Sequence, residues 1–521
     1  MSDLREVTKS VKQLDSLDKG LGDSIKITYG GFLSISVLYL VIPIVIMIMT
    51  WLKLFIALPA SLLLLGVTVL SIRTLKDTDC EFAFSIKKSH IIILAVLALF
   101  LTILFGVGEF VNTMDDHAYR RAMLRDLIER DWPLYYDLTE QSNPAINAYL
   151  PDCTVAFAYY LTYWMVPACL GKIAGFTAGN IMNVIWSAFG IFLVMLALCL
   201  YSKRFTWASV FTLVFFSGLD AIPYFVNMAR NADTWLEGWT DHISFISNIN
   251  DLLNTYNQCI PCWIITALII MLPDNRFTGF IGALMFAYSP WATIGILPLA
   301  LYRLLSNDRK IGRILSYGNL IVPAVLLICY APMYMANTSS VSVKGSTIAF
   351  YGGFFPFIKA YFLVMLIEVI PYAIVLFGKH RKNGFLWVSV AVLAVLPFYK
   401  VSFYNDLTMR GAMPALFVFC MMLTGLIGEY FSLNFKNGHF AGKADIRTVC
   451  VALMLAVMAF VAFQQLLLVV VNTADKNAKD PKEAIGSFGD INDPDYAEQV
   501  NGNFFVYDYE DQFFYKYMAR K

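Results

Sequence analysis

Charged side chains are scarce in this chain. Asp, Glu, Lys and Arg make up 15% of the 521 residues, whereas hydrophobic residues make up 58% and the mean hydropathy is +0.62. A soluble domain cannot bury so much apolar surface, so the composition excludes an ordinary water-soluble protein. The formal net charge is only +1, which gives no reason to expect a nucleic-acid partner.

Strong metal and redox motifs are also missing. The five histidines include no pair with a strict ligand spacing such as His-Glu-x-x-His. Most of the nine cysteines fall inside apolar runs, and Cys259 and Cys262 lie at a predicted helix start without a thioredoxin-like context, so we expect packing thiols. No internal repeat is visible. A polar stretch of about 28 residues precedes the first apolar run, so no cleavable signal peptide is expected.

Apolar runs long enough to cross a bilayer recur along the chain, and continuous rather than alternating runs indicate helices. Only helices and closed barrels satisfy their backbone hydrogen bonds in lipid. We therefore expect an all-α, polytopic transmembrane protein in a lipid bilayer, with a break at Ser289-Pro290 between two short spans. The expected spans, about 13 in number, lie near 28–50, 53–73, 90–108, 177–200, 206–226, 257–272, 277–290, 291–305, 317–335, 357–378, 385–399, 408–430 and 448–471.

The distribution of Lys and Arg predicts the orientation, because cytoplasmic loops are enriched in both. With the N-terminus inside, the first segment and the inner loops hold 22 of the 39 Lys and Arg residues. We therefore expect a cytoplasmic N-terminus and, from the odd number of spans, an extracytoplasmic C-terminus.

This orientation divides the chain into five parts. They are a cytoplasmic segment 1–27, two N-terminal spans with an inner loop 28–89, a module 90–226 with the outer loop 109–176, a second transmembrane module 227–472, and an extracytoplasmic tail 473–521. In the outer loop we expect an amphipathic helix over 119–130 and an interfacial helix over 151–170. The aromatic residues of the tail predict that it docks on the outer face.

Two acidic sites fall on the predicted outer face. Asp115 and Asp116 follow the third span, and Asp220 lies in an apolar run where the fifth span ends. Taken alone, Asp115 and Asp116 are explained by a solvated loop, but a carboxylate inside an apolar run is costly and marks a functional candidate. The two sites together could hold a divalent cation, Mg or Mn, or one could hold metal or acceptor while the other acts as a general base.

Two histidines on the predicted outer side each follow an aspartate. They are His117, after Asp116, and His242, after Asp241. Neutral imidazole beside carboxylate suits several divalent metals, so we consider a metal site of Asp116, Asp220, His117 and His242. Surface histidines in an interfacial loop are the alternative.

Three cations on the same side are candidates for binding phosphate. Arg410 lies at the outer start of a span, and the planar guanidinium of arginine binds phosphate oxygens in pairs. The alternative is an arginine that is ion-paired, with Asp406 as the partner. Lys400 and Arg230 are the further candidates for this role.

Several pieces of the chain, in this order, resemble a known family. The acidic pair is followed by Leu124-Arg125-Asp126-Leu127-Ile128, Trp132-Pro133, a Pro- and Tyr-rich stretch, and Ser217-Gly218-Leu219-Asp220; Asn405-Asp406 to Arg410 come later. The part of this pattern within about 90–226 resembles the polytopic GT-C glycosyltransferases. With the later piece, the chain resembles more closely a set of bacterial multi-pass membrane proteins of this class. The chain departs from the family in having Asp-Asp rather than Asp-Glu, which leaves open whether Asp115 or Asp116 is the base.

The resemblance implies a mechanism in the bacterial plasma membrane. A polyprenyl-phosphate-linked sugar is the donor, and a hydroxyl of a glycan, lipid or protein is the acceptor. Asp116 accepts the hydroxyl proton, Arg410 and a divalent metal stabilise the departing phosphate, and Asp220 orients the acceptor or binds the metal. A single displacement implies inversion at the anomeric carbon.

Other functions remain open. Glu368 lies well inside the tenth span and could be a proton or ion site, which favours a transporter or flippase of lipid-linked glycans. A polymerase or ligase that joins whole lipid-linked glycans is a third possibility, and a non-catalytic scaffold a fourth.

Overall fold

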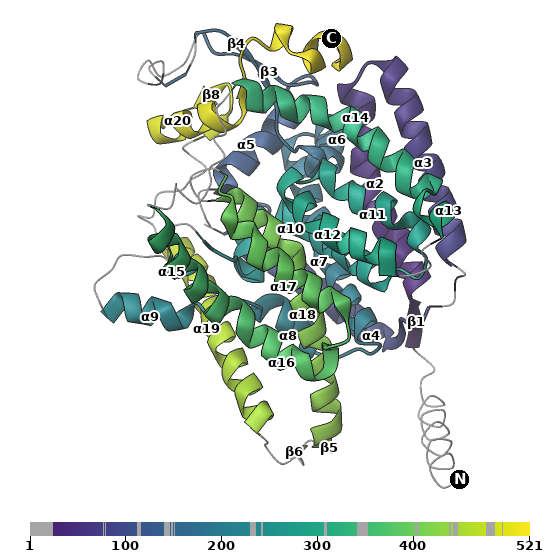
Figure 1. Ribbon diagram of the computed structural model, residues 1–521. Coiled ribbons are helices and arrows are strands. Elements are labelled where there is room, and N and C mark those ends of the chain that lie inside the picture. The colour runs from purple at the N-terminus through teal and green to yellow at the C-terminus, as the bar shows by residue number, and fades with distance from the viewer. Residues whose placement is uncertain are drawn as a thin grey trace.

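Helices make up most of this protein (Figure 1). The computed structural model describes residues 24–76, 78, 80–111, 116–139, 146, 149–150, 152–229, 236–240, 243–306, 310–340, 353–401, 405–436, 439–440, 446–475, 485–491 and 493–520. The helices are α2 (Tyr29–Trp51), α3 (Leu54–Lys76), α4 (Lys88–Leu104), α5 (Asp116–Glu129), α6 (Met165–Ala174), α7 (Phe176–Tyr201), α8 (Ala208–Phe215), α9 (Ala221–Ala229), α10 (Asn248–Met271), α11 (Thr278–Ala283), α12 (Pro290–Ser306), α13 (Ile311–Ile314), α14 (Tyr317–Ser340), α15 (Phe354–Val364), α16 (Ile370–His380), α17 (Gly384–Val395), α18 (Asp406–Asn434), α19 (Ile446–Ala474) and α20 (Pro494–Asn503).

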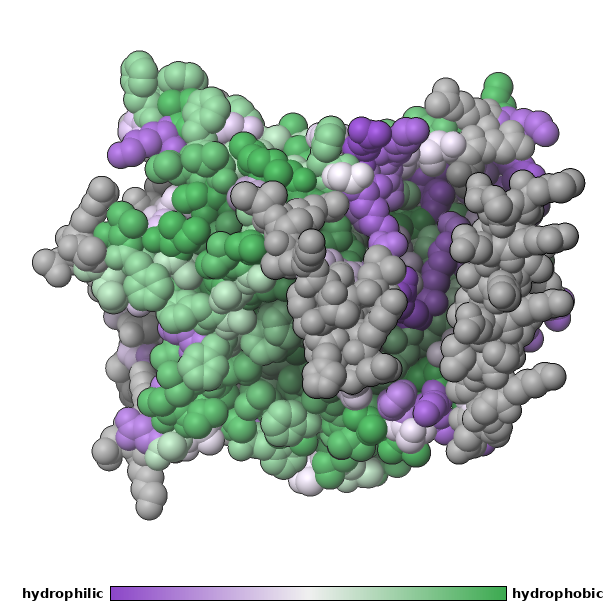
Figure 2. All heavy atoms as spheres, turned by 90° about the horizontal axis from the view of Figure 1, so that it is seen from below, coloured by the Kyte–Doolittle hydropathy of each residue, from purple (hydrophilic) through white to green (hydrophobic). Residues whose placement is uncertain are grey.

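Membrane-spanning helices are present, as the sequence predicts. In the described part of the chain, seven segments are long and apolar enough to cross a bilayer: Tyr29–Trp51, Leu54–Lys76, Phe176–Tyr201, Ile311–Ala336, Phe354–His380, Asp406–Tyr430 and Val449–Ala474. Large apolar side chains such as Phe55 and Phe355 are exposed on them, and much of the face in Figure 2 is hydrophobic. The protein is therefore an integral membrane protein whose partner is the lipid bilayer.

Some expected spans differ from the helices observed. The expected span 206–226 is two short helices, α8 and α9, separated by residues 216–220. Helix α8 ends at this point, because Phe216 has an extended backbone. Its carbonyl oxygen accepts a hydrogen bond from the backbone N–H of Asn248, at the start of α10, at 3.0 Å. The expected break at Ser289-Pro290 is confirmed, because α12 begins at Pro290.

Small β-sheets lie at the two ends of the helical bundle. At one end β1 (Ser24–Thr28) pairs antiparallel with β2 (Ala83–Lys87). At the other end a three-stranded sheet has the order β3 (Tyr135–Asp137), β4 (Thr154–Phe157), β9 (Phe505–Val506). The further short pairs are β5 (Phe435–Lys436) with β6 (His439–Phe440) and β7 (Ile485–Ser487) with β8 (Asp490–Ile491).

The first long loop is partly as predicted. The amphipathic helix expected over 119–130 is α5. The interfacial helix expected over 151–170 is wrong in its first half, because residues 154–157 form β4 and helix begins only near 162. Strand β4 is the middle strand of its sheet, and its residues Val155, Ala156 and Phe157 are buried. These consecutive residues are apolar because both faces of the strand are buried.

A buried carboxylate ties α5 to the C-terminal segment. Asp126 is 1% exposed, and it accepts hydrogen bonds from Ser487 Oγ (2.7 Å), the backbone N–H of Phe488 (2.9 Å) and the hydroxyl of Tyr136 (2.8 Å). Burial raises the pKa of Asp126, although these three donors lower it. The C-terminal segment therefore docks against the first loop, and its expected position on the outer face stays a prediction.

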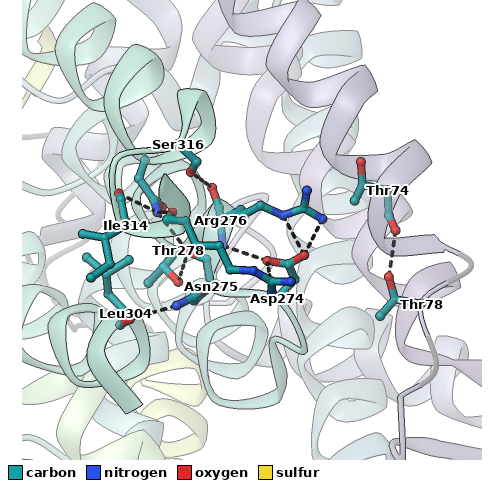
Figure 3. Close-up of polar contacts among 11 residues, drawn as sticks. Thr74, Thr78, Asp274, Asn275, Arg276, Thr278, Leu304, Ile314 and Ser316 are labelled. Carbon is teal, nitrogen blue, oxygen red and sulfur yellow. Dashed lines mark hydrogen bonds and ion pairs between the residues drawn. The ribbon is translucent and has the colours of Figure 1, made fainter. Parts of the chain in front are cut away.

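A second polar cluster lies directly after α10, at the end of the bundle opposite the C-terminal segment (Figure 3). Asp274 accepts from the backbone N–H of Arg276 at 3.0 Å, and its Oδ2 lies 2.8 Å from Nε and 2.6 Å from Nη2 of the same residue. The carbonyl oxygen of Arg276 accepts from Ser316 Oγ at 2.7 Å, and Asn275 Nδ2 donates to the carbonyl of Leu304 at 3.0 Å. These bonds join the turn before α11 to the end of α12 and the start of α14.

Candidate functional site

The candidate site is built on a kink in α10. The first half of this helix is unusually polar for a buried segment, with Asn248, Asn250, Asp251, Asn257 and Gln258 all nearly inaccessible. Thr255 departs from helical geometry, with φ −141° and ψ 36°. Its hydroxyl donates to the carbonyl oxygen of Asp251 at 3.1 Å. The kink thus presents polar groups to the neighbouring helices α5 and α18.

Asp116 and Arg120 form the α5 side of the site. Asp116 is the first residue of α5, its side chain is 44% exposed, and its Oδ2 lies 3.0 Å from Nη2 of Arg120. A carboxylate at a helix N-terminus is favoured by the backbone N–H groups that point toward it. Arg120 is nearly buried, at 9% exposure, and its Nε donates to Asn257 Oδ1 of α10 at 3.4 Å.

One donor of Arg120 is unused. Its Nη1 is buried and has no hydrogen-bond partner among the residues that the structure describes. A buried guanidinium nitrogen without an acceptor costs free energy, so it indicates a place for an anionic group. The guanidinium also lies over the ring of Tyr256, 5.7 Å from its centroid, which fixes its plane.

Arg410 reaches the same stretch of α10 from the other side. Its Nη1 donates to Thr255 Oγ1 at 3.4 Å, and its Nη2 lies 3.8 Å from Asp406 Oδ1, so the predicted ion pair with Asp406 is present. The charges of Asp406, Asp251 and Asp116 all act on the guanidinium of Arg410. The structure therefore brings two of the predicted site residues, Asp116 and Arg410, to one kink.

Two tyrosines of the first loop border these charges. The rings of Tyr159 and Tyr160 lie 3.8 Å apart between centroids. Burial raises the pKa of Tyr159, while the charges of Arg120 and Arg410 act to lower it. We call Asp116, Arg120, Tyr159, Tyr160, Thr255, Asn257, Asp406 and Arg410 the kink site.

His117 does not face a metal site with its Nε2. That nitrogen lies 2.6 Å from the carbonyl oxygen of Leu253, which can only accept, so Nε2 carries the proton. The ring stacks on Tyr256, with 5.9 Å between centroids. Within the described ranges, no three or more His, Cys, Asp or Glu side chains are grouped so that they could hold a metal ion. Because His242 lies outside the described residues, the expected metal site of Asp116, Asp220, His117 and His242 stays a prediction.

Asp220 takes partners of its own. It is fully buried between α8 and α9, and the indole N–H of Trp239 is shared between Asp220 Oδ1 at 3.0 Å and Glu368 Oε1 at 3.2 Å. Glu368 is 1% exposed and lies in a π-helical turn, residues 365–369, between α15 and α16. Such turns interrupt the regular helix and occur often at functional sites.

The Asp220–Glu368 pair is closely packed and short of donors. Asp220 Oδ2 and Glu368 Oε2 are buried and accept from no other donor among the described residues. Two ionised carboxylates cannot stay so close in an apolar setting, so one proton is expected on the pair. Gly218 is needed beside it, because a Cβ there would lie 2.5 Å from Asp220 Oδ2 and 3.0 Å from Glu368 Cγ.

A third buried acid lies next to this pair. Glu237 is fully buried, but its carboxylate accepts several hydrogen bonds, unlike the pair. The donors are the backbone N–H of Ser247 at 3.1 Å, the hydroxyl of Ser247, and Asn250 Nδ2 at 3.1 Å. The charge of Glu237 acts on Asp220. Sequence reasoning did not single out Glu237 or Thr255, although the polar residues of 248–258 inside an apolar region were a signal for Thr255.

The other predicted residues are only partly placed. Lys400 is 1% exposed and lies shortly before α18. Asp115, Arg230 and His242 lie outside the described residues. Comparisons of the chain with protein-family models, with curated proteins and with solved structures find no match.

Proposed function

We propose that this protein is a GT-C-type glycosyltransferase that moves a sugar from a polyprenyl-phosphate-linked donor to an acceptor hydroxyl. The observation that carries the proposal is the kink site, where a half-exposed carboxylate lies among two guanidinium groups and two tyrosines. This combination suits a reaction that needs a proton acceptor and a phosphate leaving group in one place.

The proposed reaction is a single displacement. The acceptor hydroxyl oxygen forms a bond to the anomeric carbon, the bond from that carbon to the phosphate oxygen breaks, and the hydroxyl proton passes to the carboxylate of Asp116. The electron pair leaves with the polyprenyl phosphate, whose added negative charge is met by Arg120 and Arg410. The anomeric configuration is inverted, because the acceptor attacks opposite the leaving group.

The position of the two arginines supports this assignment. Arg120 has a buried Nη1 without an acceptor in the described structure, and Arg410 is only 13% exposed. Guanidinium groups shielded from water bind phosphate more strongly than exposed ones, since less charge screening occurs. Both are held in place through α10, so a phosphate would meet them already oriented.

The proposal extends to the membrane. We propose about thirteen crossings in a bacterial plasma membrane, with the N-terminus in the cytoplasm and the kink site on the extracytoplasmic side. Support comes from the Lys and Arg distribution and from the position of β1 and the C-terminal segment at opposite ends of the bundle (Figure 1). A polyprenyl phosphate would then reach the kink site from the outer leaflet.

The test is sugar transfer by purified full-length protein in lipid vesicles, with a polyprenyl-phosphate sugar and a panel of hydroxyl acceptors. Asp116→Asn is expected to abolish product formation. Glu129→Gln is the matched control, because Glu129 is a carboxylate on the same helix that is 54% exposed and paired with Arg125. Full activity of Asp116→Asn would sink the proposal, and loss of activity in Asp115→Asn alone would move the base to Asp115.

A transporter or flippase of lipid-linked glycans is the second candidate. It is favoured by the Asp220–Glu368 pair, because a buried pair of acids beside a membrane-spanning segment can take up and release a proton. Reconstituted vesicles would then move a labelled lipid-linked glycan across the bilayer, Glu368→Gln would stop the movement, and no glycosyl product would form.

A further inference from the structure

A cavity with a strongly basic lining opens at the end of the bundle opposite the kink site. Its volume is about 900 Å³, which is in the range of small-molecule binding sites. It lies where α7, α12 and α16 end and α17 begins, beside the loop that precedes β2. Figure 2 shows hydrophilic side chains gathered in a hollow on a face that is largely hydrophobic elsewhere. The residues that line the cavity come from these helix ends and from the loop before β2.

The lining carries an excess of positive charge. Five lysine or arginine residues line it, and Glu81 is the one carboxylate among the lining residues; five positive charges less one negative leave +4, with His380 counted as neutral. The five cations are Lys203, Arg204, Arg303, Lys379 and Lys382. Cations concentrated in a concave site raise the local concentration of anions.

Several of these cations are held in place by the protein. Arg303 donates from Nε to the carbonyl oxygen of Ile269 at 2.9 Å, and its guanidinium lies 5.2 Å from the centroid of Phe385. Lys203 is paired with Glu81, and Lys379 with Glu429. Lys382 has no ion pair among the described residues. Two of the five cations are therefore paired with carboxylates, whereas Lys382 is not paired in the described part of the chain.

The surroundings of the cavity suit an amphiphile. Apolar side chains next to the lining residues are exposed: Leu301 is 55% and Leu305 is 41% exposed on either side of Tyr302 and Arg303, and Trp387 is 44% exposed near the start of α17. In a membrane protein such residues face acyl chains. A ligand with a phosphate head and an apolar tail would contact both surfaces.

We propose that this cavity binds a phosphate group, supplied by the headgroup of an anionic phospholipid. The proposal does not depend on the glycosyltransferase assignment, because the cavity and the kink site share no residue, but it rests on the proposed orientation, which puts this end of the bundle on the cytoplasmic side. Basic pockets between membrane helices on the cytoplasmic side are a recognised way to hold anionic headgroups, and anionic lipids are concentrated in that leaflet. A soluble phosphate compound offers the same chemistry, and the experiment distinguishes the two.

The experiment is lipid retention by the purified full-length protein, measured by native mass spectrometry with added phosphatidylglycerol or phosphatidylcholine. The expected result is preferential retention of phosphatidylglycerol. Lys382→Gln and Lys379→Gln are each expected to weaken it about fivefold, the effect of removing one cation near a headgroup. Arg381→Gln is the matched control, because Arg381 is adjacent in sequence but does not line the cavity. A thermal unfolding curve for each variant checks that it is folded.

A second arm identifies the source of the phosphate. If inorganic phosphate displaces phosphatidylglycerol from the wild type, the cavity recognises the headgroup phosphate. If inorganic phosphate binds, with loss in Lys382→Gln, while phosphatidylglycerol is not retained, the cavity serves a soluble phosphate compound. The proposal is overturned if the wild type retains both lipids equally and binds no phosphate, or if Arg381→Gln loses as much lipid as Lys382→Gln.

Discussion

The guanidinium of Arg120 lies 3.0 Å from Oδ2 of Asp116, one helical turn earlier in α5, and keeps a second, unpaired nitrogen in the interior. If that nitrogen meets the phosphate of the donor, Arg120→Lys should lower kcat about 10²–10³-fold, as for the loss of one donor to a developing charge. Arg121→Lys is the matched control, since Arg121 pairs with Glu109 instead. Steady-state transfer kinetics would measure both, and an equal loss in the two variants would remove Arg120 from the mechanism.

Arg410 is expected to act mainly on the donor. It is held by Thr255 and Asp406, so Arg410→Lys loses the fork that could bind two phosphate oxygens while it keeps one positive charge. We expect weaker binding of polyprenyl phosphate, measured as an inhibition constant, with Asp406→Asn giving a smaller effect in the same direction. Unchanged inhibition by polyprenyl phosphate in Arg410→Lys would show that the phosphate binds elsewhere.

Asp220 and Glu368 should behave as one unit. Each single amide variant, Asp220→Asn or Glu368→Gln, replaces one acid of a pair that shares the indole donor of Trp239. We expect the effects on stability to be non-additive, with a coupling of about 1–3 kcal/mol in a double-mutant cycle followed by thermal unfolding. Additive effects would mean that the two carboxyl groups do not share a proton.

The bond from Ser487 to Asp126 should stabilise the docked C-terminal segment. Ser487→Ala leaves a buried carboxylate oxygen short of a donor, so we expect a loss of about 1–3 kcal/mol in the free energy of unfolding. Hydrogen exchange of α5 and β9 would show whether the loss is local. Thr139→Ala is the control, since its hydroxyl binds the exposed Asp137, and it should change stability little.

The hydrogen bonds of Asp274, in the polar cluster after α10, predict that the stability of the fold depends on pH. Burial acts to raise the pKa of Asp274, but hydrogen bonds from Arg276 outweigh this and lower it below the ordinary value. A carboxyl whose pKa is lower in the folded state stabilises the fold above the unfolded pKa of about 3.9 and loses that contribution as the pH falls through the folded pKa. Asp274→Asn should therefore lower the melting temperature at pH 7, and the difference from the wild type should shrink toward pH 3.

Hydrophobic runs were enough to predict a helical membrane protein, because apolar length alone determines which segments can enter lipid. They were less informative for the buried interior. Residues 154–157 are as apolar as a helix in the interface, but they form the middle strand of a sheet whose third strand, 505–506, is distant in sequence. No local pattern contains that pairing.

The candidate site could be predicted only in part for the same reason. Asp116 and Arg410 stood out because charge at the edge of a span is costly, and the structure brings them to one helix. The kink at Thr255, where Arg410 of α18 donates to the threonine hydroxyl, was not predicted from the sequence. The acid that shares the indole donor of Trp239 with Asp220 proved to be Glu368, which the sequence suggested for a different function. Tertiary contacts decide these partners.

The sheet β3–β4–β9 also has a consequence for the order of assembly. Asp126 meets Ser487, 361 residues later in the chain, and β4 cannot gain its third strand until β9 has been synthesised. During synthesis every intervening helix leaves the ribosome while the first loop is still incomplete. The loop that carries Asp116 therefore acquires its final packing only at the end of translation, so a truncated chain would reach the membrane with its helices inserted and this face unfinished.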